Sequence, residues 1–405
     1  MTAAPSRPRT PPVVVVGIGA DGWDGLSPLA RAAVQDADVL VGSARQLDLV
    51  PTSAAERRTW PSPLVPAITG LFAELAGRAV VVLASGDPML SGIGTTLVRE
   101  LGADAVRVLP APSSVSLACA RLGWAVEDTQ VVSLVGRPVE LLHPHVHPGR
   151  RLLVLGSDGA TPAAVAALLT DRGYGESTVT VLAALGGPEE SVTTGTASAW
   201  VDRAHPLVVT AVECRGAALL PTTPGLPDDA FEHDGQLTKS EVRAVTLARL
   251  APVPGQLLWD VGAGSGSIGI EWMRVHPSSR AVAVEPVAER AARIARNAAG
   301  LGVPGLRVVH GRAPDALAGL PAPDAVFVGG GATTPLLLDA CWDALAAGGR
   351  LVVNAVTVQS EAVLADWQSR YGGAMVRLAV QRAEPVGGFL GWKAAMPVTI
   401  WSGTR

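Results

Sequence analysis

The sequence predicts an α/β protein of two or three domains, built around strands that are buried on both faces. Three observations support this fold class. Short runs of valine and leucine alternate along the chain with helical patterns. Of the 405 residues, 48% are apolar, which suffices for more than one core. Proline, glycine and acidic residues replace the apolar periodicity at 213–236, which indicates a connection between domains.

The region before this connection, residues 11–215, is expected to form a domain of two lobes, at about 11–136 and 150–215. The segment between the lobes, 137–150, reads RPVELLHPHVHPGR and lacks the patterns of a strand or helix. Strands are predicted at 13–19, 79–85, 106–110, 130–136, 151–156, 179–185 and 206–213, with helical patterns such as 28–37 and 161–173 between them. Residues 216–235 are predicted to be a linker.

The remaining region, residues 236–405, repeats the alternation. Strands are predicted at 257–262, 280–286, 306–311, 324–330 and 349–356, and helices at 241–250, 288–300 and 336–348. This spacing is typical of a doubly wound, mainly parallel sheet with helices on both faces. Two further strands are expected in close succession within the terminal segment GGFLGWKAAMPVTIWSG.

Several classes of protein are excluded by composition. No apolar run is long enough to cross a bilayer, and the first residues, MTAAPSRPRTPP, lack the apolar stretch of a signal peptide, so we expect a cytoplasmic protein. Cys119, Cys214 and Cys341 are far apart in sequence, which favours reduced thiols over disulfides. His143, His145 and His147 are interleaved with prolines, which favours a solvated connection, so no metal site is predicted.

Charge is unevenly distributed between the two regions. Residues 1–235 carry 16 Lys and Arg against 24 Asp and Glu, whereas residues 236–405 carry 16 against 12. The basic excess of the second region is too small and too dispersed to indicate nucleic-acid binding. It is compatible with a small polyanionic substrate.

The clearest functional motif is WDVGAGSGSIGIE, residues 259–271, in which a glycine loop joins a predicted strand to a helix. Such a loop lets backbone N–H groups approach a nucleotide. Gly264, Gly266 and Gly269 also have the spacing of a dinucleotide fingerprint, and Glu285 ends the next strand, where it could bind a ribose. The loop alone leaves nicotinamide, flavin and S-adenosylmethionine open as cofactors.

Three features favour S-adenosylmethionine. Asp260 ends the strand before the loop, and its carboxylate suits a cationic ligand better than a pyrophosphate. Ala313 and Asp315 follow the third predicted strand, where an adenine would lie. An antiparallel terminal pair of strands, expected within 387–403, is typical of methyltransferase sheets.

The second region also resembles the decarboxylating precorrin methyltransferase domains of cobalamin biosynthesis. The resemblance rests on QLTKSEVRAVTLARL, the glycine loop, VAVEP, GRAPDAL, DAVFVGGG and GGRLVVNAV, which cover most of residues 236–405. It implies a Rossmann-like class I methyltransferase fold. It also implies one S-adenosylmethionine site, with contacts from Thr238, Gly262, Ala263, Gly264, Ser265, Gly266, Glu285 and Ala313.

The first region resembles the tetrapyrrole methylase family, which uses the same cofactor on an unrelated two-lobed fold. Four motifs appear in the family's order: VVVVGIGADGWDGLSPLA, LASGDPMLSGIGTTL, LPAPSSVSLACARLG and VVSLVGRP. The resemblance implies a second cofactor site, with contacts from Ser85, Gly86, Asp87, Leu90, Ser113, Ser114, Leu155 and Gly186. The first loop, GIGADGWDG, departs from the family's GxGPGD pattern, so a contact from Ala20 is not predicted.

Together the two resemblances indicate the fused methyltransferases of the aerobic corrin pathway. They imply methylation of a precorrin at carbons 5 and 15 with decarboxylation of the ring C acetate, carbon 5 being assigned to the first domain and the other steps to the second. No side chain is assigned as acid, base or nucleophile. The chain's two lysines, Lys239 and Lys393, with Arg243 and Arg382, are the candidates for binding substrate carboxylates. Both families commonly associate, so a homo-oligomer is expected.

Three alternative functions are considered. A nicotinamide oxidoreductase would use the glycine fingerprint but not the motifs of the first region. A non-catalytic sensor would bind the cofactor and lack an open substrate cleft. A methyltransferase with another tetrapyrrole substrate would keep both cofactor sites.

Overall fold

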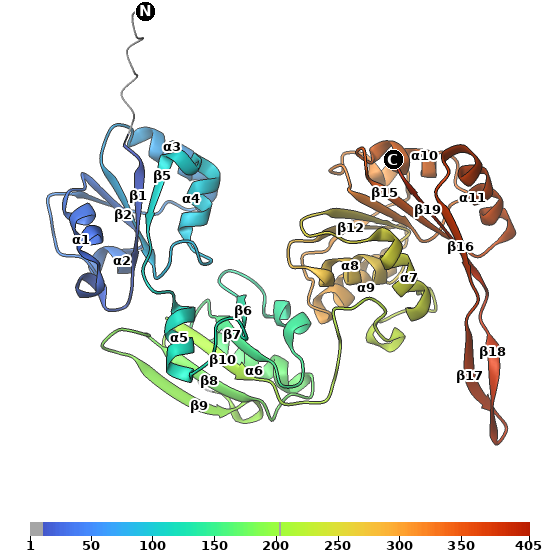
Figure 1. Cartoon of the computed structure of the whole chain (residues 1–405), viewed down its shortest axis with the longest axis horizontal. Helices are drawn as coiled ribbons and strands as arrows, with labels where there is room; N and C mark the ends of the chain where they lie inside the picture. The colour runs from blue at the N-terminus through green and yellow to red at the C-terminus, as the bar shows by residue number, and fades with distance from the viewer. Residues whose placement is uncertain (1–10, 202–203) are drawn as a thin grey trace, which may run out of the picture. The chain divides into compact units, whose positions relative to one another are not determined.

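The computed structural model describes residues 11–201 and 204–405, which divide into two units (Figure 1). Of the described residues, the first unit holds 11–139 and 148–218. The second unit holds Glu140–His147 and Leu219–Arg405. Each unit is an α/β structure with its own cores, as the alternation of strand and helix patterns predicted.

The first lobe of the first unit is a parallel sheet of five strands in the order β3-β2-β4-β1-β5. The strands are β1 Val13–Ile18, β2 Val39–Gly42, β3 Glu56–Thr59, β4 Val80–Ser85 and β5 Val106–Leu109. The helices are α1 Pro28–Gln35, α2 Ala44–Asp48, α3 Leu64–Glu74 and α4 Ile93–Leu101. Neighbouring residues of β1, such as Val15 and Val16, belong to different core clusters, because successive side chains of a strand point to opposite faces.

The second lobe is a mixed sheet in the order β6-β7-β10-β8-β9. Its strands are β6 Gln130–Ser133, β7 Arg151–Leu155, β8 Thr178–Ala183, β9 Ser191–Thr196 and β10 Val208–Glu213. Only β6 and β7 are parallel, whereas β10 runs antiparallel to β7 and β8. Its helices are α5 Ser114–Leu122 and α6 Thr161–Asp171. Because β6 pairs with β7 and α5 packs on this sheet, the second lobe includes residues that the sequence placed in the first lobe.

The second unit is a seven-stranded sheet in the order β13-β12-β11-β14-β15-β19-β16, parallel except at β19. Its strands are β11 Leu257–Val261, β12 Arg280–Glu285, β13 Arg307–His310, β14 Ala325–Val328, β15 Arg350–Ala355, β16 Ala374–Leu378 and β19 Val398–Thr404. Its helices are α7 Ser240–Leu250, α8 Ser267–Val275, α9 Ala288–Gly300, α10 Leu337–Ala344 and α11 Val358–Tyr371. Two separate core clusters draw on alternate residues of the central strands, so both faces of the sheet are covered.

A two-stranded hairpin, β17 Gln381–Val386 and β18 Phe389–Ala394, extends from the second unit as a separate sheet (Figure 1). The terminal segment therefore contains two strands, as predicted, but they belong to different sheets. Strand β18 pairs with β17, whereas β19 lies between β15 and β16. Phe389 and Trp392 of the hairpin are 84% and 75% exposed.

Part of the predicted linker is folded into the second unit. Leu226 and Phe231 are buried in the same cluster as the core of the sheet. Short 3-10 helices are η1 Gly22–Gly25, η2 Ala103–Ala105, η3 Val139–His145, η4 Ala197–Ala199, η5 Asp228–Ala230 and η6 Asp315–Leu317.

Within the described residues, none of the helices has the length and apolarity that a membrane span requires. The same residues contain no group of three or more His, Cys, Asp or Glu side chains placed to bind a metal ion, and all three cysteines are buried.

Candidate functional site

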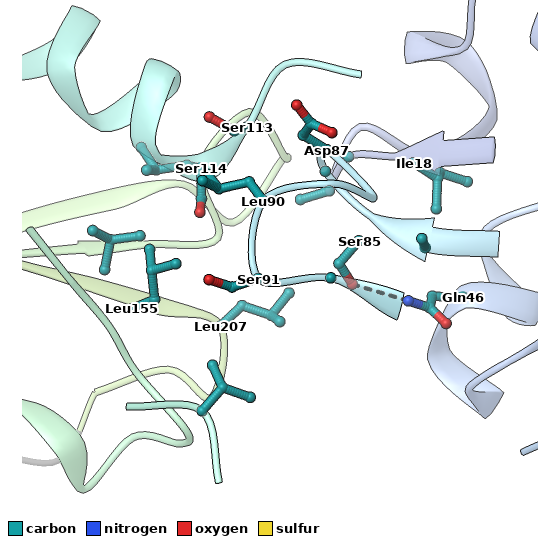
Figure 2. Close-up of a pocket in the computed structure, with 18 of the residues that line it drawn as sticks. Ile18, Gln46, Ser85, Asp87, Leu90, Ser91, Ser113, Ser114, Leu155 and Leu207 are labelled. Atoms are coloured by element: carbon teal, nitrogen blue, oxygen red, sulfur yellow. Dashed lines mark hydrogen bonds between the residues drawn. The ribbon is translucent and has the colours of Figure 1, made fainter. Parts of the chain in front are cut away.

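The first unit contains a cavity of about 490 Å³ lined by residues of both lobes (Figure 2). Seven of the eight cofactor-binding candidates of this unit line it, namely Ser85, Gly86, Asp87, Leu90, Ser113, Ser114 and Leu155. Gly186 does not line this cavity, whereas Ala20, for which no contact was predicted, does. Four ordered sequence motifs therefore meet at one cavity.

Close backbone packing fixes the loop that follows β4. The N–H of Gly86 donates to the carbonyl of Ile18 at 2.9 Å, so the ends of β1 and β4 are joined. A Cβ at Gly17 would lie 2.2 Å from the carbonyl oxygen of Gly86, which requires glycine there. Gly86 itself has φ of +57°, a conformation that glycine adopts without strain. The SGDPM motif is thus held against the first strand.

Hydrogen bonds organise the polar side chains around this cavity. The Oγ of Ser113 accepts from the N–H of Ser116 at 3.0 Å and caps α5. The Oγ of Ser85 accepts from Gln46 Nε2 at 3.0 Å, as Figure 2 shows, and from Arg45 Nη2 at 2.8 Å. Asp87 Oδ1 accepts from the N–H of Met89 at 2.8 Å, which stabilises the turn of the loop.

Gly186 lies on the exposed turn after β8. Its N–H donates to Glu190 Oε2 at 2.7 Å. Glu190 forms an ion pair with Arg121 at 2.6 Å, and this pair holds the pKa of the Glu190 carboxyl below its usual range. The N–H of Gly186 therefore stabilises the turn after β8 through Glu190.

Two buried acidic residues shape the glycine loop of the second unit. Glu285, 2% exposed, accepts from the N–H of Gly264 at 2.8 Å and from that of Val287 at 3.1 Å. Gly262, Gly264 and Gly266 have φ between +61° and +79°, the left-handed region. A Cβ at Gly266 would lie 2.7 Å from Ile294 Cγ2. The loop is thus a cradle of backbone groups in conformations that favour glycine, and Gly266 packs too closely against α9 to accept a side chain.

Asp260 lies beneath this loop and is 1% exposed. Its Oδ2 accepts from the N–H of Gly269 at 2.9 Å, whereas its buried Oδ1 has no hydrogen-bond partner among the described residues. Burial raises the pKa of the Asp260 carboxyl to about 7, against the opposing effect of the Gly269 hydrogen bond, and the charge of Glu285 adds to the rise. Asp260 therefore supports α8 from below and does not face an open cleft.

Three further cofactor candidates of this unit lie in the loop or beside it, namely Ala263, Ser265 and Ala313. The carbonyl of Ala263 accepts from the N–H of Gly266 at 2.8 Å. Ser265 is buried, and its Oγ has no hydrogen-bond partner among the described residues. Ala313 packs against the core under the end of β13, where Gly311 donates its N–H to the carbonyl of Glu285 at 3.1 Å. The ends of β11, β12 and β13 therefore bring these candidates to one edge of the sheet.

Three candidates line a smaller cavity of about 140 Å³ at the same unit, Thr238, Lys239 and Arg382. Lys239 Nζ lies 3.5 Å from Asp228 Oδ2, and Arg382 Nε donates to Glu241 Oε1 at 3.3 Å. The cavity also has apolar lining, including Leu378, Val380 and Met396, and a polar contribution from Asn354. These last four residues had no distinctive sequence signal. Lys393 lies elsewhere, on the hairpin, 2.8 Å from Glu384.

Arg243 is not at the substrate rim, which corrects the sequence prediction. Its side chain is fully buried, and its Nε donates to Glu271 Oε1 at 2.5 Å. Its other nitrogens donate to the carbonyl groups of Thr238 and Leu226. Glu271 also accepts from the N–H groups of Gly225 and Leu226 at 2.6 and 3.0 Å. The pair therefore fastens the folded part of the linker to α7 and α8.

Comparison with known proteins shows two family matches along the chain. Residues 12–200 match the tetrapyrrole (corrin/porphyrin) methylases, and residues 229–405 match the precorrin methyltransferase domain. The precorrin-6Y C(5,15)-methyltransferase [decarboxylating] of Sinorhizobium sp is 52% identical over 401 residues, covering 98% of this chain and 97% of that protein. The chain belongs to this family. Its members are S-adenosylmethionine-dependent C-methyltransferases, so the predicted family, fold class and kind of enzyme are confirmed.

Two shorter relatives of the chain are each named for one methylation. The cobalt-precorrin-7 C(5)-methyltransferase of Salmonella typhimurium is 34% identical over 163 residues, covering 40% of this chain and 80% of that protein. The "Probable cobalt-precorrin-6B C(15)-methyltransferase (decarboxylating)" of Pyrobaculum calidifontis is 40% identical over 143 residues, covering 34% of this chain and 73% of that protein. The family membership excludes the oxidoreductase alternative. The individual cofactor and substrate contacts stay predictions.

Proposed function

We propose that the chain carries one S-adenosylmethionine site in each unit, and that the units divide the family's reaction between them. The family methylates a precorrin with decarboxylation in cobalamin biosynthesis. In this proposal the first unit methylates carbon 5, and the second unit methylates carbon 15 and decarboxylates the ring C acetate. The observation that carries it is the presence of two separate loops at strand ends, Ser85–Leu90 and Gly262–Gly266, one in each family match. The cytoplasmic location stays a prediction.

The first unit supports this role through the size and chemistry of its cavity. A volume of about 490 Å³ lies within the range of small-molecule sites. Ser85, Gly86, Asp87 and Leu90 on one side, and Ser113 and Ser114 on the other, would hold the cofactor, which supplies an electrophilic methyl group. A meso carbon of a reduced tetrapyrrole is enamine-like and attacks such a methyl group when both are held in line. Positioning by the two lobes would then supply much of the acceleration.

The second unit supports its role through the glycine cradle and the adjoining cavity. The backbone of Gly262–Gly266, with Glu285 and Ala313, would hold the second cofactor molecule, and Glu285 suits ribose hydroxyls. Lys239 and Arg382 would bind substrate carboxylates at the rim. The apolar lining by Leu378 and Met396 would leave the departing carboxylate poorly solvated while the macrocycle accepts its electrons. No side chain is assigned as acid or base.

We also propose that the chain forms a homo-oligomer through the hairpin of β17 and β18. The cross-strand pairs Ala383–Trp392 and Pro385–Leu390 share one face, whereas Arg382–Lys393 lies on the other. Trp392 and Leu390 are 75% and 72% exposed, and an isolated two-stranded hairpin is only marginally stable in water. Light scattering should show a smaller particle for a Leu390→Ser, Trp392→Lys variant. Phe389→Ser, on the opposite face, is the control and should leave the mass unchanged.

Product mass tests the division of labour. Wild-type protein, a precorrin and S-adenosylmethionine should give a product with two added methyl groups and one lost carbon dioxide. Gly264→Arg should abolish carbon 15 methylation and decarboxylation, whereas Asp87→Ala should reduce carbon 5 methylation. Gly348→Arg is a matched control, because Gly348 also has a left-handed φ, of +81°, but faces open space. Asp104→Ala, on an exposed residue of the first unit, controls for Asp87→Ala.

Two results would contradict the proposal. If Gly264→Arg and Asp87→Ala stopped the reaction at the same partial product, the two units would not act separately. If wild-type protein bound two molecules of S-adenosylmethionine but changed no precorrin, the sensor or altered-substrate alternative would be favoured. Binding stoichiometry by calorimetry, measured on the same samples, distinguishes these results.

A further inference from the structure

We propose that Arg45 binds a carboxylate group in the cavity of the first unit. The proposal rests on the function proposed for that unit, and the expected ligand is a carboxylate arm of the precorrin. Arg45 and Asp87 are the two charged residues among the described residues that line the cavity. Arg45 is therefore the cation available there to an anionic ligand. Sequence patterns did not single it out.

The position of Arg45 follows from how the chain leaves β2. This buried strand ends at Gly42, and Ser43 caps the short helix α2 with its side chain. Gln46 closes the capping box, since its Oε1 accepts from the N–H of Ser43 at 2.8 Å. Strands β2 and β4 are parallel neighbours, so α2 begins at the same edge of the sheet as the loop after β4. Arg45 therefore lies beside the loop that follows β4, at the cavity.

Ser85 fixes the side chain of Arg45 at that edge. Arg45 Nη2 donates to Ser85 Oγ at 2.8 Å, and Gln46 Nε2 donates to the same oxygen at 3.0 Å. Gln46 is 9% exposed, so this arrangement is anchored in the folded lobe. A guanidinium has five N–H donors in a planar fork that matches a carboxylate. The bond to Ser85 uses one of them and orients the fork.

The charge of Arg45 is not neutralised by the unit itself. Among the described residues, no carboxylate lies within ion-pair distance of Arg45. Other arginines of the same unit do have such partners, for example Arg78 with Glu56 at 2.6 Å and Arg121 with Glu190 at 2.6 Å. Arg45 is half-buried, and burial lowers the pKa of its guanidinium. A partly desolvated, unpaired cation in a cavity favours an anionic ligand.

Two molecules could supply the carboxylate. A precorrin carries several carboxylate arms around its macrocycle, and S-adenosylmethionine carries one on its amino-acid end. Both would be recognised by the same fork. The experiment therefore measures the two ligands separately.

The test compares Arg45→Met and Arg45→Lys with wild-type protein in the full chain. The KM for precorrin in carbon 5 methylation should rise about 10–100-fold in Arg45→Met, because a hydrogen bond to a charged group is lost. In Arg45→Lys the KM for precorrin should rise less, since an ammonium retains the charge but not the planar fork. The Kd of S-adenosylmethionine at the first unit should be unchanged. Arg107→Met, on an exposed arginine of β5 outside the cavity, should behave as wild type.

The second unit provides an internal control. Carbon 15 methylation and decarboxylation should be unchanged in every Arg45 variant, which shows that the second unit is folded. Retained binding of S-adenosylmethionine at the first unit shows that the unit holding Arg45 is folded. A higher Kd for S-adenosylmethionine, with no effect on its decarboxylated analogue, would assign the carboxylate to the cofactor. Unchanged KM and unchanged Kd in Arg45→Met would overturn the proposal. Failure of the proposed function is distinct, because wild type and Arg107→Met would then also lack carbon 5 methylation.

Discussion

The two units fix their candidate cofactor loops by different physical means. In the first unit, the loop after β4 is held by backbone contact with β1 and by neutral caps, such as Ser113 on α5. In the second unit, the glycine loop depends on the buried carboxylates of Asp260 and Glu285. The segment beside that loop is fastened by the buried pair of Arg243 and Glu271.

This difference predicts how each unit responds to the loss of one side chain. In the described part of the first unit, both side chains of every ion pair are at least 22% exposed, so solvent screens these pairs and each contributes little to stability. Arg243 and Glu271 are 0% and 2% exposed. Removing one member of a buried pair leaves an uncompensated charge, so the second unit should be the more sensitive.

Arg243→Met should have the largest effect. Glu271 would remain buried without its cation, and the carbonyl groups of Thr238 and Leu226 would lose a donor. We expect the second unit to lose about 3–5 kcal/mol of unfolding free energy, measured by hydrogen exchange in α7 and α8. Exchange in α5 of the first unit should not change.

Two further variants sharpen this test. Arg121→Met breaks the exposed pair with Glu190 and should leave the stability of the first unit nearly unchanged, because solvent screens this pair. The double variant Arg243→Met, Glu271→Leu should recover part of the lost stability, because no buried charge is left. A loss below about 1 kcal/mol in Arg243→Met would show that the two units do not differ in this way.

Asp260→Asn should have an effect on stability that depends on pH, small near pH 4 and growing toward pH 7. The pKa of Asp260 is about 7 in the folded protein and near its ordinary value of 3.8 when unfolded. Between pH 4 and 7 the folded state therefore binds more protons, and this group lowers the unfolding free energy of the second unit as pH rises. The slope is at most about 1.4 kcal/mol per pH unit.

The asparagine variant lacks this titration but keeps an oxygen that accepts from Gly269. Relative to wild type, it should therefore gain stability when the pH is raised from 5 to 8. Denaturation monitored by hydrogen exchange in α8 at both pH values measures this difference. Asp229→Asn, on an exposed residue of the same unit, should not alter the pH dependence. Equal pH slopes for Asp260→Asn and wild type would contradict a buried, titrating Asp260.

The features that were predictable from sequence are local ones. The valine runs at β1 and β4 reveal buried strands, because few residues other than β-branched and aliphatic ones pack on both faces of a sheet. The glycines of 262–266 reveal a loop with left-handed backbone, since other residues avoid positive φ. The candidates of the first unit came from the family resemblance of its motifs, and seven of the eight line one cavity.

The features that were missed depend on contacts between distant parts of the chain. Arg243 lies within the family motif at 236–250 and carries a charge, but only its buried pairing with Glu271, 28 residues later, shows that it is a structural cation. Strand direction in the second lobe was likewise not apparent, because valine-rich runs such as β8 and β10 suit parallel and antiparallel sheets. Residues 226–231 were predicted to be part of a linker because they are rich in proline and acidic residues, although Leu226 and Phe231 are buried. Arg45 had no signal beyond its place after a buried strand.

Ser113→Ala should have the smallest effect, and it tests whether the neutral caps of the first unit serve the cofactor site. The Oγ of Ser113 accepts from the N–H of Ser116 at 3.0 Å, and loss of such a cap costs about 1 kcal/mol. Hydrogen exchange in α5 should report this loss, and the Kd of S-adenosylmethionine at the first unit should rise with it. Ser113→Asn separates the two roles, because asparagine is as good a cap as serine but adds volume at the cavity wall. It should restore the stability of α5 while cofactor binding stays weak, whereas recovery of both would mean that Ser113 acts only as a cap.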